Sequence, residues 1–433
     1  MYAKTLAFIF AAALGGSALA APQIQQWQTT NGARVFFVPA PEIPMLDAQV
    51  VFDAGSARDL TKPGIAVLTN GMLNEGAGDK NADAIAELFA TLGARQGNSA
   101  ERDMASFSLR SLTDPSKLQP AADLLALILK QPTFPQDAFA RVQSNALVGL
   151  QAQKQSPDEI TSEAFFKAVY GTHPYASDPS GNEVSVKALT VDDLKAFYKQ
   201  YYVARNAVVA IVGAIDRSGA EKLANTLVGG LPEGAAAAKL PEVTSLTQAT
   251  VVKLSHPSTQ THVMLGQPGI RRADPDYFAL YLGNHILGGN GLVSRISDEI
   301  REKRGLSYSA YSYFMPMRDR GPYVLGLQTR TDKTDEAVKV LKDTLDKFVK
   351  DGPTAKELEA AKKNITGGFA LRVDSNKKIA DYLSLIGFYN LPLDYLDTFI
   401  TRMNAVTLQQ VKDAFKRRVD PSKLVTVVVG KQS

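Results

Sequence analysis

The sequence predicts an α+β fold built from two homologous domains, and two observations support this prediction. Strand-like and helix-like patterns alternate within the same part of the chain, which fits neither an all-helical nor an all-strand architecture. The chain also repeats itself at an offset of 217 residues. With 433 residues, of which 45% are hydrophobic and 21% charged, it has the composition of a globular protein and the length of two or three domains.

In the first half, short apolar runs separated by Pro, Asn and Gly predict antiparallel strands before the helices begin. We expect strands at residues 35–38, 50–52 and 107–112. Apolar residues at helical spacing predict helices at residues 64–73, 82–92, 120–129, 136–154 and 157–169. Asn81 or Asp83 is the expected cap of the second helix, because its side chain can accept a hydrogen bond from a free backbone N–H.

The repeat is clearest at the end of each half. Residues 188–213 align with residues 405–430 without a gap, and Thr190 falls on Thr407. In both copies the Thr precedes a helical pattern, and a β-branched strand ending in Gly follows. A gap-free match of this length indicates two copies of one domain rather than chance similarity.

The domain boundaries follow from this repeat and from composition. Residues 228–248 are rich in Gly, Ala and Pro and form the expected linker, so the two domains span residues 22–227 and 249–433. Residues 1–20 have a positive start at Lys4, an apolar core and a small-residue end at Ala18-Leu19-Ala20, which is typical of a cleavable secretory signal. We therefore expect a periplasmic protein.

Several classes of function do not fit the composition. The net charge is +4, and no DNA-binding motif or polybasic run is present, so we expect no nucleic-acid partner. After the signal, no stretch approaches the roughly 20 apolar residues that a membrane helix needs. The absence of cysteine excludes disulfides and thiolate chemistry.

Residues 288–312 carry the most reactive-looking side chains. Leu292, Ile296 and Ile300 predict one apolar stripe of a helix that ends before Gly305, and residues 306–314 alternate like a strand. Arg301 would then close the helix and Tyr308 would open the strand. A guanidinium and a phenol across such a turn can converge on one carbonyl oxygen. The spacing alone also allows a solvated helix end beside a half-buried tyrosine, and by itself it favours that alternative.

This segment and residues 51–76 (VFDAGSARDLTKPGIAVLTNGMLNEG) resemble the pitrilysin/insulinase family of zinc peptidases, in particular the smaller two-chain members similar to the mitochondrial processing peptidase. The resemblance covers nearly the whole mature chain. It implies that each domain is an α/β sandwich with a large, mostly antiparallel sheet backed by helices, and that the two domains face a partner chain across a peptide-binding chamber. It further implies that Arg301 and Tyr308 bind the substrate backbone and stabilise the tetrahedral intermediate.

The sequence departs from that family at the metal site. Active members carry His-x-x-Glu-His on the first-half helix, where this chain has Val67, Leu68, Thr69, Asn70 and Gly71. A third ligand, Glu, would fall near Gly149, and residues 142–157 contain no acidic residue. We therefore expect no metal and no cofactor on this chain, and zinc in a partner subunit.

The remaining candidates for chemistry are weak. None of the four histidines, His173, His256, His262 and His285, pairs with a second ligand at helical spacing. The first of them precedes a proline in a turn and is expected to hydrogen-bond there. Residues 288–291 lack the Lys-Ser/Thr of a phosphate loop, and no Gly-x-Ser-x-Gly elbow occurs. Residues 97–99 occupy the place of an edge strand to which a peptide could add.

The sequence therefore predicts the zinc-free subunit of a periplasmic heteromeric zinc metallopeptidase, inactive alone, that binds peptide together with a zinc-bearing paralogous chain. Arg301 and Tyr308 are the predicted catalytic residues, and no metal-binding residue is predicted. The alternative is a non-catalytic structural or peptide-binding protein of the same fold. An autonomous peptidase with unusual ligands is disfavoured by the missing carboxylates.

Overall fold

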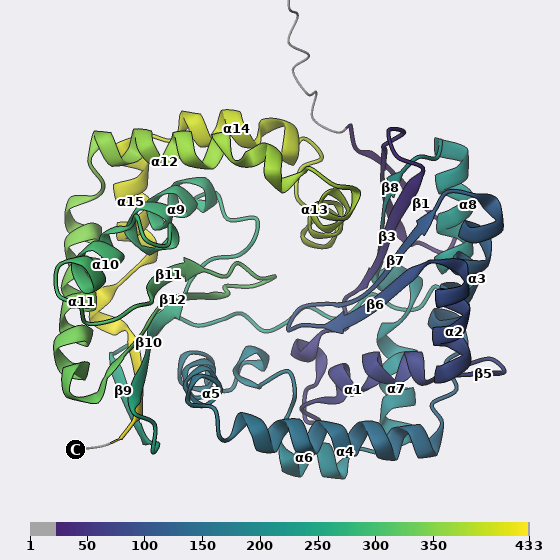
Figure 1. The fold of residues 1–433 in the computed structure, drawn as a ribbon, viewed down its shortest axis with the longest axis horizontal. Helices are drawn as coiled ribbons and strands as arrows, with labels where there is room; N and C mark the ends of the chain where they lie inside the picture. The colour runs from purple at the N-terminus through teal and green to yellow at the C-terminus, as the bar shows by residue number, and fades with distance from the viewer. Residues whose placement is uncertain (1–22, 432–433) are drawn as a thin grey trace, which may run out of the picture.

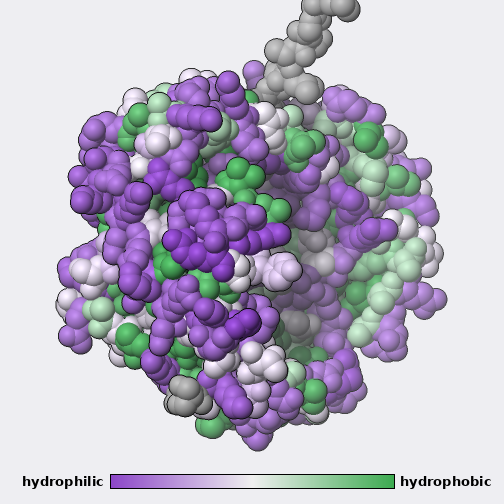
Figure 2. Space-filling model, turned by 60° about the vertical axis from the view of Figure 1, so that its left-hand side comes forward, coloured by the Kyte–Doolittle hydropathy of each residue, from purple (hydrophilic) through white to green (hydrophobic). Residues whose placement is uncertain are grey.

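A computed structural model describes residues 23–431, and the predicted signal peptide lies outside the described residues. The chain forms two halves that lie side by side, each a twisted sheet with helices packed against it (Figure 1). The space-filling view shows a hollow near the middle of one face, bordered mostly by hydrophilic residues (Figure 2). Within the described residues, no helix is both long and apolar enough to cross a bilayer.

The first half is built on a six-stranded sheet in the order β1-β2-β8-β3-β7-β6. Its strands are β1 (Gln25–Gln28), β2 (Arg34–Pro39), β3 (Met45–Phe52), β6 (Arg95–Ala100), β7 (Ala105–Leu112) and β8 (Ala207–Gly213). Only the pair β2–β8 is parallel. A small ribbon of β4 (Gly76–Ala77) and β5 (Lys80–Asn81) lies apart from it. Strand β6 is an edge, as expected for residues 97–99.

The second half repeats this plan with five strands in the order β9-β13-β10-β12-β11. They are β9 (Thr250–Ser255), β10 (Gln260–Pro268), β11 (Ala310–Phe314), β12 (Pro322–Arg330) and β13 (Val425–Gly430), and only β13–β9 is parallel. Strand β12 begins at residue 322, the same offset of 217 from the first residue of β7 that the sequence repeat has. The expectation of a mostly antiparallel sheet in each half is confirmed.

Helices cover both sheets. In the first half they are α1 (Ile65–Met72), α2 (Ala82–Leu92), α3 (Pro115–Lys130), α4 (Gln136–Gln153), α5 (Pro157–Tyr170), α6 (Glu183–Ala188), α7 (Val191–Tyr201) and α8 (Arg217–Val228). In the second half they are α9 (Tyr277–Asn284), α10 (Arg295–Ser297), α11 (Thr334–Asp351), α12 (Ala355–Gly367), α13 (Asn376–Tyr389), α14 (Tyr395–Ala405) and α15 (Leu408–Arg418). Residues 229–249, between α8 and β9, contain no helix or strand.

Capping explains where the repeated helices begin. Thr190 caps α7 and Thr407 caps α15, each accepting a hydrogen bond from the third helical residue, whose own side chain accepts from the Thr N–H. Asn81 caps α2 as expected. Helix α3 begins at Pro115, five residues before the predicted start, because the Asp114 carboxylate accepts from Ser116 N and an earlier proline occupies the first turn.

Each half donates one helix to the other half's sheet. Helix α13 packs on β8 and β3 of the first sheet, and α5 packs on β10 and β13 of the second. The two helices are counterparts in the repeat, and both lie on the interior side of the sheets (Figure 1). Leu383 of α13 is fully buried in one cluster with Val208, and Phe165 of α5 is fully buried with Val427. The hydrophobic cores therefore bind the halves to each other.

A buried polar network also joins the halves. The Asp103 carboxylate accepts hydrogen bonds from the Tyr175 hydroxyl at 2.7 Å, from the Tyr389 hydroxyl at 2.9 Å and from the Arg318 backbone N–H at 2.7 Å. Tyr175 belongs to the first half, and the other two donors belong to the second. Asp103 is only 5% exposed, so these bonds are needed to satisfy its charge.

Candidate functional site

Arg301 lies on a helix that is shorter and wider than expected. Ser294 caps α10 by accepting from Ser297 N, and the helix continues as one π-turn over Asp298–Glu302. Ile296 and Ile300 are fully buried, but Leu292 precedes the helix and is 62% exposed, so the predicted stripe is wrong at its first member. Periodicity could not show this, because a polar cap two residues later sets the start of the helix.

Tyr308 also differs from its expected place. Gly305 turns the chain with φ of 59°, as predicted, but strand β11 begins only at Ala310. Tyr308 therefore lies in the turn before the strand rather than opening it. The Ser307 side chain bends this turn by donating to Ser309 O and accepting from Ser309 N, which delays pairing with β12.

The turn nevertheless brings the two predicted residues together. The guanidinium carbon of Arg301 lies 5.6 Å from the centroid of the Tyr308 ring, within the range of a cation–π contact. Arg301 also lies beside Glu302, with Nε 3.4 Å from Oε1. Tyr308 is 91% exposed. Both polar ends are thus accessible to a ligand.

Helix α1 carries the residues at the positions of the family's His-x-x-Glu-His motif. Val67 and Gly71 are half-exposed on one face, and Asn70 is only 2% exposed. The Asn98 side chain on edge strand β6 donates to Asn70 Oδ1 at 2.7 Å and accepts from Asn74 Nδ2 at 2.7 Å. A chain of neutral amides therefore occupies this place, and amide groups are poor ligands for zinc.

The space that larger side chains would need is still open. A Cβ atom added at Gly71 of α1 or at Gly149 of α4 would meet no atom within 4 Å. Within residues 23–431, no three His, Cys, Asp or Glu side chains gather as a metal-binding group. The residues present therefore do not fit zinc, although a larger side chain could begin at either glycine without a clash.

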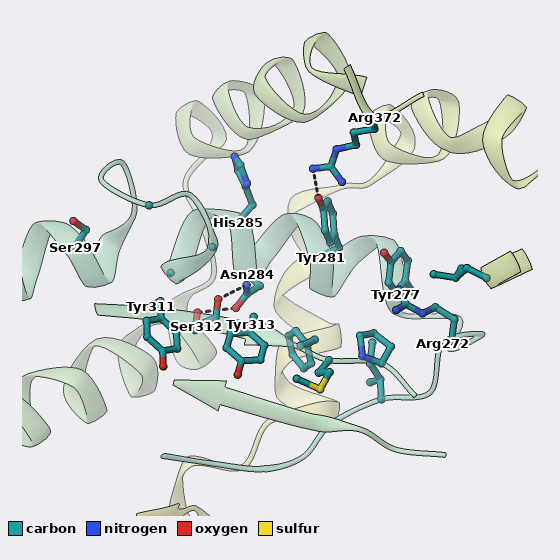
Figure 3. Close-up of a pocket in the computed structure, with 18 of the residues that line it drawn as sticks. Arg272, Tyr277, Tyr281, Asn284, His285, Ser297, Tyr311, Ser312, Tyr313 and Arg372 are labelled. Atoms are coloured by element: carbon teal, nitrogen blue, oxygen red, sulfur yellow. Dashed lines mark hydrogen bonds between the residues drawn. The ribbon is translucent and has the colours of Figure 1, made fainter. Parts of the chain in front are cut away.

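A cleft of about 800 Å³ opens beside Tyr308 on the second half. Helix α9 contributes Tyr277 and Tyr281, and His285 follows it in a π-turn. Strand β11 contributes Tyr311 and Tyr313, while Arg272 lies in a turn and Arg372 ends a short 3-10 helix (Figure 3). Ser309 and Tyr308 itself also line it. The predicted Arg–Tyr pair thus stands at a tyrosine-rich cleft of the size that ligand sites have.

Strand β11 is held firmly against α9. Asn284 Nδ2 donates to Ser312 O at 2.8 Å, and Ser312 Oγ donates to Asn284 Oδ1 at 2.7 Å. Gly288 allows this close approach, because a Cβ there would lie 2.4 Å from Ser312 Oγ. The cleft wall is therefore rigid where it carries Tyr311 and Tyr313.

Burial keeps the cleft's tyrosines protonated. Burial raises the pKa of Tyr313 to about 12 and also raises the pKa of Tyr281. The positive charge of Arg372, which donates a hydrogen bond to Tyr281 OH at 2.6 Å, opposes the shift of Tyr281. Burial lowers the pKa of His285, and Arg372 adds to that lowering. At neutral pH the cleft thus offers phenol donors, a neutral imidazole and two cations.

The whole chain is similar to known proteins. Residues 35–181 match the family described as insulinase (peptidase family M16), and residues 188–365 match the peptidase M16 inactive domain. A solved structure of a peptidase M16 inactive domain from Pseudomonas fluorescens is 44% identical, covers 95% of this chain and 98% of its own, and superposes with a TM-score of 0.92. The chain belongs to peptidase family M16.

Two M16 relatives from other bacteria extend this result. The chain is 26% identical over 383 residues to the non-peptidase homolog YmxG of Helicobacter pylori, covering 87% of this chain and 86% of that one. It is 25% identical over 393 residues to the uncharacterized zinc protease YmxG of Bacillus subtilis, covering 90% and 94%. The predicted family and the two-domain fold are confirmed, and the inactive type of M16 domain agrees with the non-ligating α1.

Sequence reasoning missed most of the M16 cleft. Tyr277 and Tyr281 are four residues apart on one helix, and this spacing could have indicated a shared face. Arg272 and Arg372 are far apart in sequence, and only the tertiary fold brings them to one cleft. His173, in contrast, was placed well: its Nδ1 accepts from Tyr175 N at 3.1 Å in the predicted turn.

Proposed function

We propose that this M16 chain is the zinc-free subunit of a periplasmic heteromeric metallopeptidase. The coarser part, an M16 chain of the inactive type, is supported by the match to the peptidase M16 inactive domain and is consistent with the non-ligating α1. The single observation that carries the finer proposal is the exposure of Tyr308 beside Arg301. A phenol that is 91% exposed at the edge of a cleft stabilises its own fold little and is free to contact a substrate.

The proposed division of work follows from the chemistry of amide hydrolysis. A zinc-bearing sister chain would supply the metal and the general base. Arg301 and Tyr308 would hold the substrate backbone and donate hydrogen bonds to the oxygen on which negative charge develops. Edge strand β6 offers unpaired backbone groups on one side, so an extended peptide can add to it.

The test is turnover by the assembled complex. Tyr308→Phe deletes only the hydroxyl and should lower kcat/KM by about 10- to 1000-fold with assembly intact. Arg301→Lys should also lower it, because lysine keeps the charge but loses the planar fork. Matched controls are Tyr201→Phe on α7 and Arg304→Lys, whose side chain pairs with Glu299. Normal turnover with Tyr308→Phe would remove the hydroxyl from the mechanism.

A second candidate is a structural or peptide-binding protein without any catalytic partner. It is supported by the similarity to a relative named a non-peptidase homolog and by the amide chain of Asn70, Asn74 and Asn98, which occupies the place of the family's zinc motif. Under this candidate, no zinc-bearing chain co-purifies, and Arg301→Ala and Tyr308→Phe would change only the stability of the chain. The two candidates therefore differ in two measurable results: whether a catalytic partner co-purifies, and whether Tyr308→Phe lowers peptide cleavage by that complex.

The proposed compartment rests on residues 1–20. Their charge, apolar core and small-residue end are those of an export signal, and the lack of cysteine suits an oxidising compartment. Fractionation of cells that express the tagged full-length chain should recover a shortened protein in the periplasm. A full-length cytoplasmic product would contradict this part of the proposal.

A further inference from the structure

The charges around the M16 cleft are unbalanced. Arg272 and Arg372 both line it, and among the residues that the structure describes neither forms an ion pair. The cleft lining includes one carboxylate, Asp381, and this group already pairs with Lys377 at 2.9 Å. Most other described arginines have a carboxylate within 4.0 Å, whereas this one cleft holds two that do not.

The arginines also leave hydrogen-bonding capacity unused. Within residues 23–431, the buried Nε–H of Arg272 has no acceptor, and the buried Nε2 of His285 in the same cleft has no hydrogen-bond partner. A buried donor without an acceptor is costly, so such groups are normally satisfied by a protein atom, water or ligand. Arg372 donates to Tyr281 OH, a neutral acceptor that leaves the charge itself uncompensated.

The surrounding groups favour an anion rather than a cation. Tyr277 and Tyr281 lie between the two guanidiniums in Figure 3, and their rings stack 5.8 Å apart. Because burial raises the pKa of Tyr281 and of Tyr395, these phenols remain proton donors at neutral pH. Guanidinium forks and phenol donors together match the planar, doubly accepting carboxylate group.

We propose that the cleft selects peptides that carry carboxylates, and that Arg272 and Arg372 are the specificity-determining residues that bind them. The carboxylate can come from an acidic side chain or from the peptide C-terminus, since both present the same two oxygens. This inference rests on the proposed function in one respect, namely that peptides reach the cleft. It requires no catalytic step and no partner.

Binding to the isolated mature chain tests the proposal without turnover. Three labelled, unstructured peptides of equal length are compared by fluorescence anisotropy: one with Glu residues and an amidated C-terminus, its Gln version with the same amide, and the Gln version with a free C-terminus. We expect a carboxylate-bearing peptide to bind roughly tenfold more tightly than the amidated Gln peptide, as one or two charge-assisted hydrogen bonds would give. The Glu peptide and the free C-terminus distinguish the two sources.

Variants of the two arginines test whether they cause the preference for carboxylate-bearing peptides. Arg372→Gln, at an exposed side chain, should keep the fold and reduce the preference, and the double variant with Arg272→Gln should abolish it. Arg272→Lys retains the charge and should keep part of the preference, which covers the case in which the glutamine variant does not fold. The matched control is Arg402→Gln, whose guanidinium lies over Phe278 outside the cleft lining and should leave the preference unchanged.

Two results would overturn the inference. Equal affinity of the wild-type chain for all three peptides, or absence of any binding, would show that the cleft does not read carboxylates. If the double variant still prefers carboxylate-bearing peptides, the carboxylate-binding site lies elsewhere on the chain. Failure of the Tyr308→Phe test in the assembled complex would, in contrast, leave this binding preference intact, so the two proposals fail separately.

Discussion

Removing one buried side chain from α13 should destabilise the half that does not contain it. Leu383 is fully buried where this second-half helix packs on the first-half sheet. Leu383→Ala deletes buried methyl groups and leaves a cavity between two packed elements, which typically costs about 2–5 kcal/mol of unfolding free energy. Leu393→Ala is the matched control, because Leu393 is 40% exposed and should cost less than about 0.5 kcal/mol.

The single tryptophan allows unfolding of the first half to be followed separately from that of the second half. Trp27 lies on β1 of the first half, with its ring edge-on to Phe37 at 6.5 Å and under the Arg217 guanidinium at 3.7 Å. Its fluorescence therefore reports the first half alone, whereas far-ultraviolet circular dichroism reports both. Because the halves exchange helices, both probes should follow one urea transition, and Leu383→Ala should move both to the same lower midpoint.

The result that would refute this reasoning is specific. If Leu383→Ala lowers the transition seen by circular dichroism and leaves the Trp27 transition in place, the halves unfold independently. The exchanged helices would then not couple them, and the shared cores would contribute little to holding the two halves together.

Three further predictions concern the metal region, the cleft wall and an ion pair. Val67→His, Asn70→Glu, Gly71→His and Gly149→Glu together should bind zinc stoichiometrically by metal analysis, since the space is open, and omission of Gly149→Glu should weaken binding strongly. Gly288→Ala should cost about 1–3 kcal/mol in urea unfolding because its Cβ would meet Ser312, whereas Gly367→Ala, which meets no atom within 4 Å, should be neutral or stabilising. The Arg295 fork lowers the pKa of Glu357 to about 2 from 4.5, so Glu357→Gln should be less stable than wild type at pH 7. A lowered carboxyl pKa stabilises the fold above the unfolded value, so this deficit should shrink as pH falls from about 4.5 towards about 2; a deficit independent of pH would contradict the assignment.

Local signals in the sequence were sufficient for the repeat and for most elements. The Thr190 and Thr407 caps, the β-branched strands after them and the constant offset are short-range features, and they fixed two homologous sheets before any tertiary contact was known. The same offset relates α5 to α13, but their crossing to opposite sheets was not predicted. Both helices have apolar faces in either arrangement, and only packing decides which sheet covers them.

The candidate site was predictable only in part. The seven-residue spacing and the Gly305 turn led to Arg301 and Tyr308, and the structure brings these side chains together, while their catalytic role stays a prediction. The predicted start of the Arg301 helix was more than two residues too early, because the Ser294 cap, and not the apolar periodicity, determines where the helix begins. Arg272 and Arg372 had no signal at all, since long-range juxtaposition leaves no local pattern.

The central claim, that this chain completes the site of a zinc-bearing sister, is tested most directly by purifying the tagged mature chain from its native periplasm without chelator. Mass spectrometry of co-purifying proteins, zinc content and cleavage of a quenched peptide are measured on the same sample. The account predicts a stoichiometric sister chain with His-x-x-Glu-His, bound zinc and peptide cleavage that is lost when either chain is removed. A lone, zinc-free and inert chain would contradict it and would leave Arg301 and Tyr308 without a catalytic role.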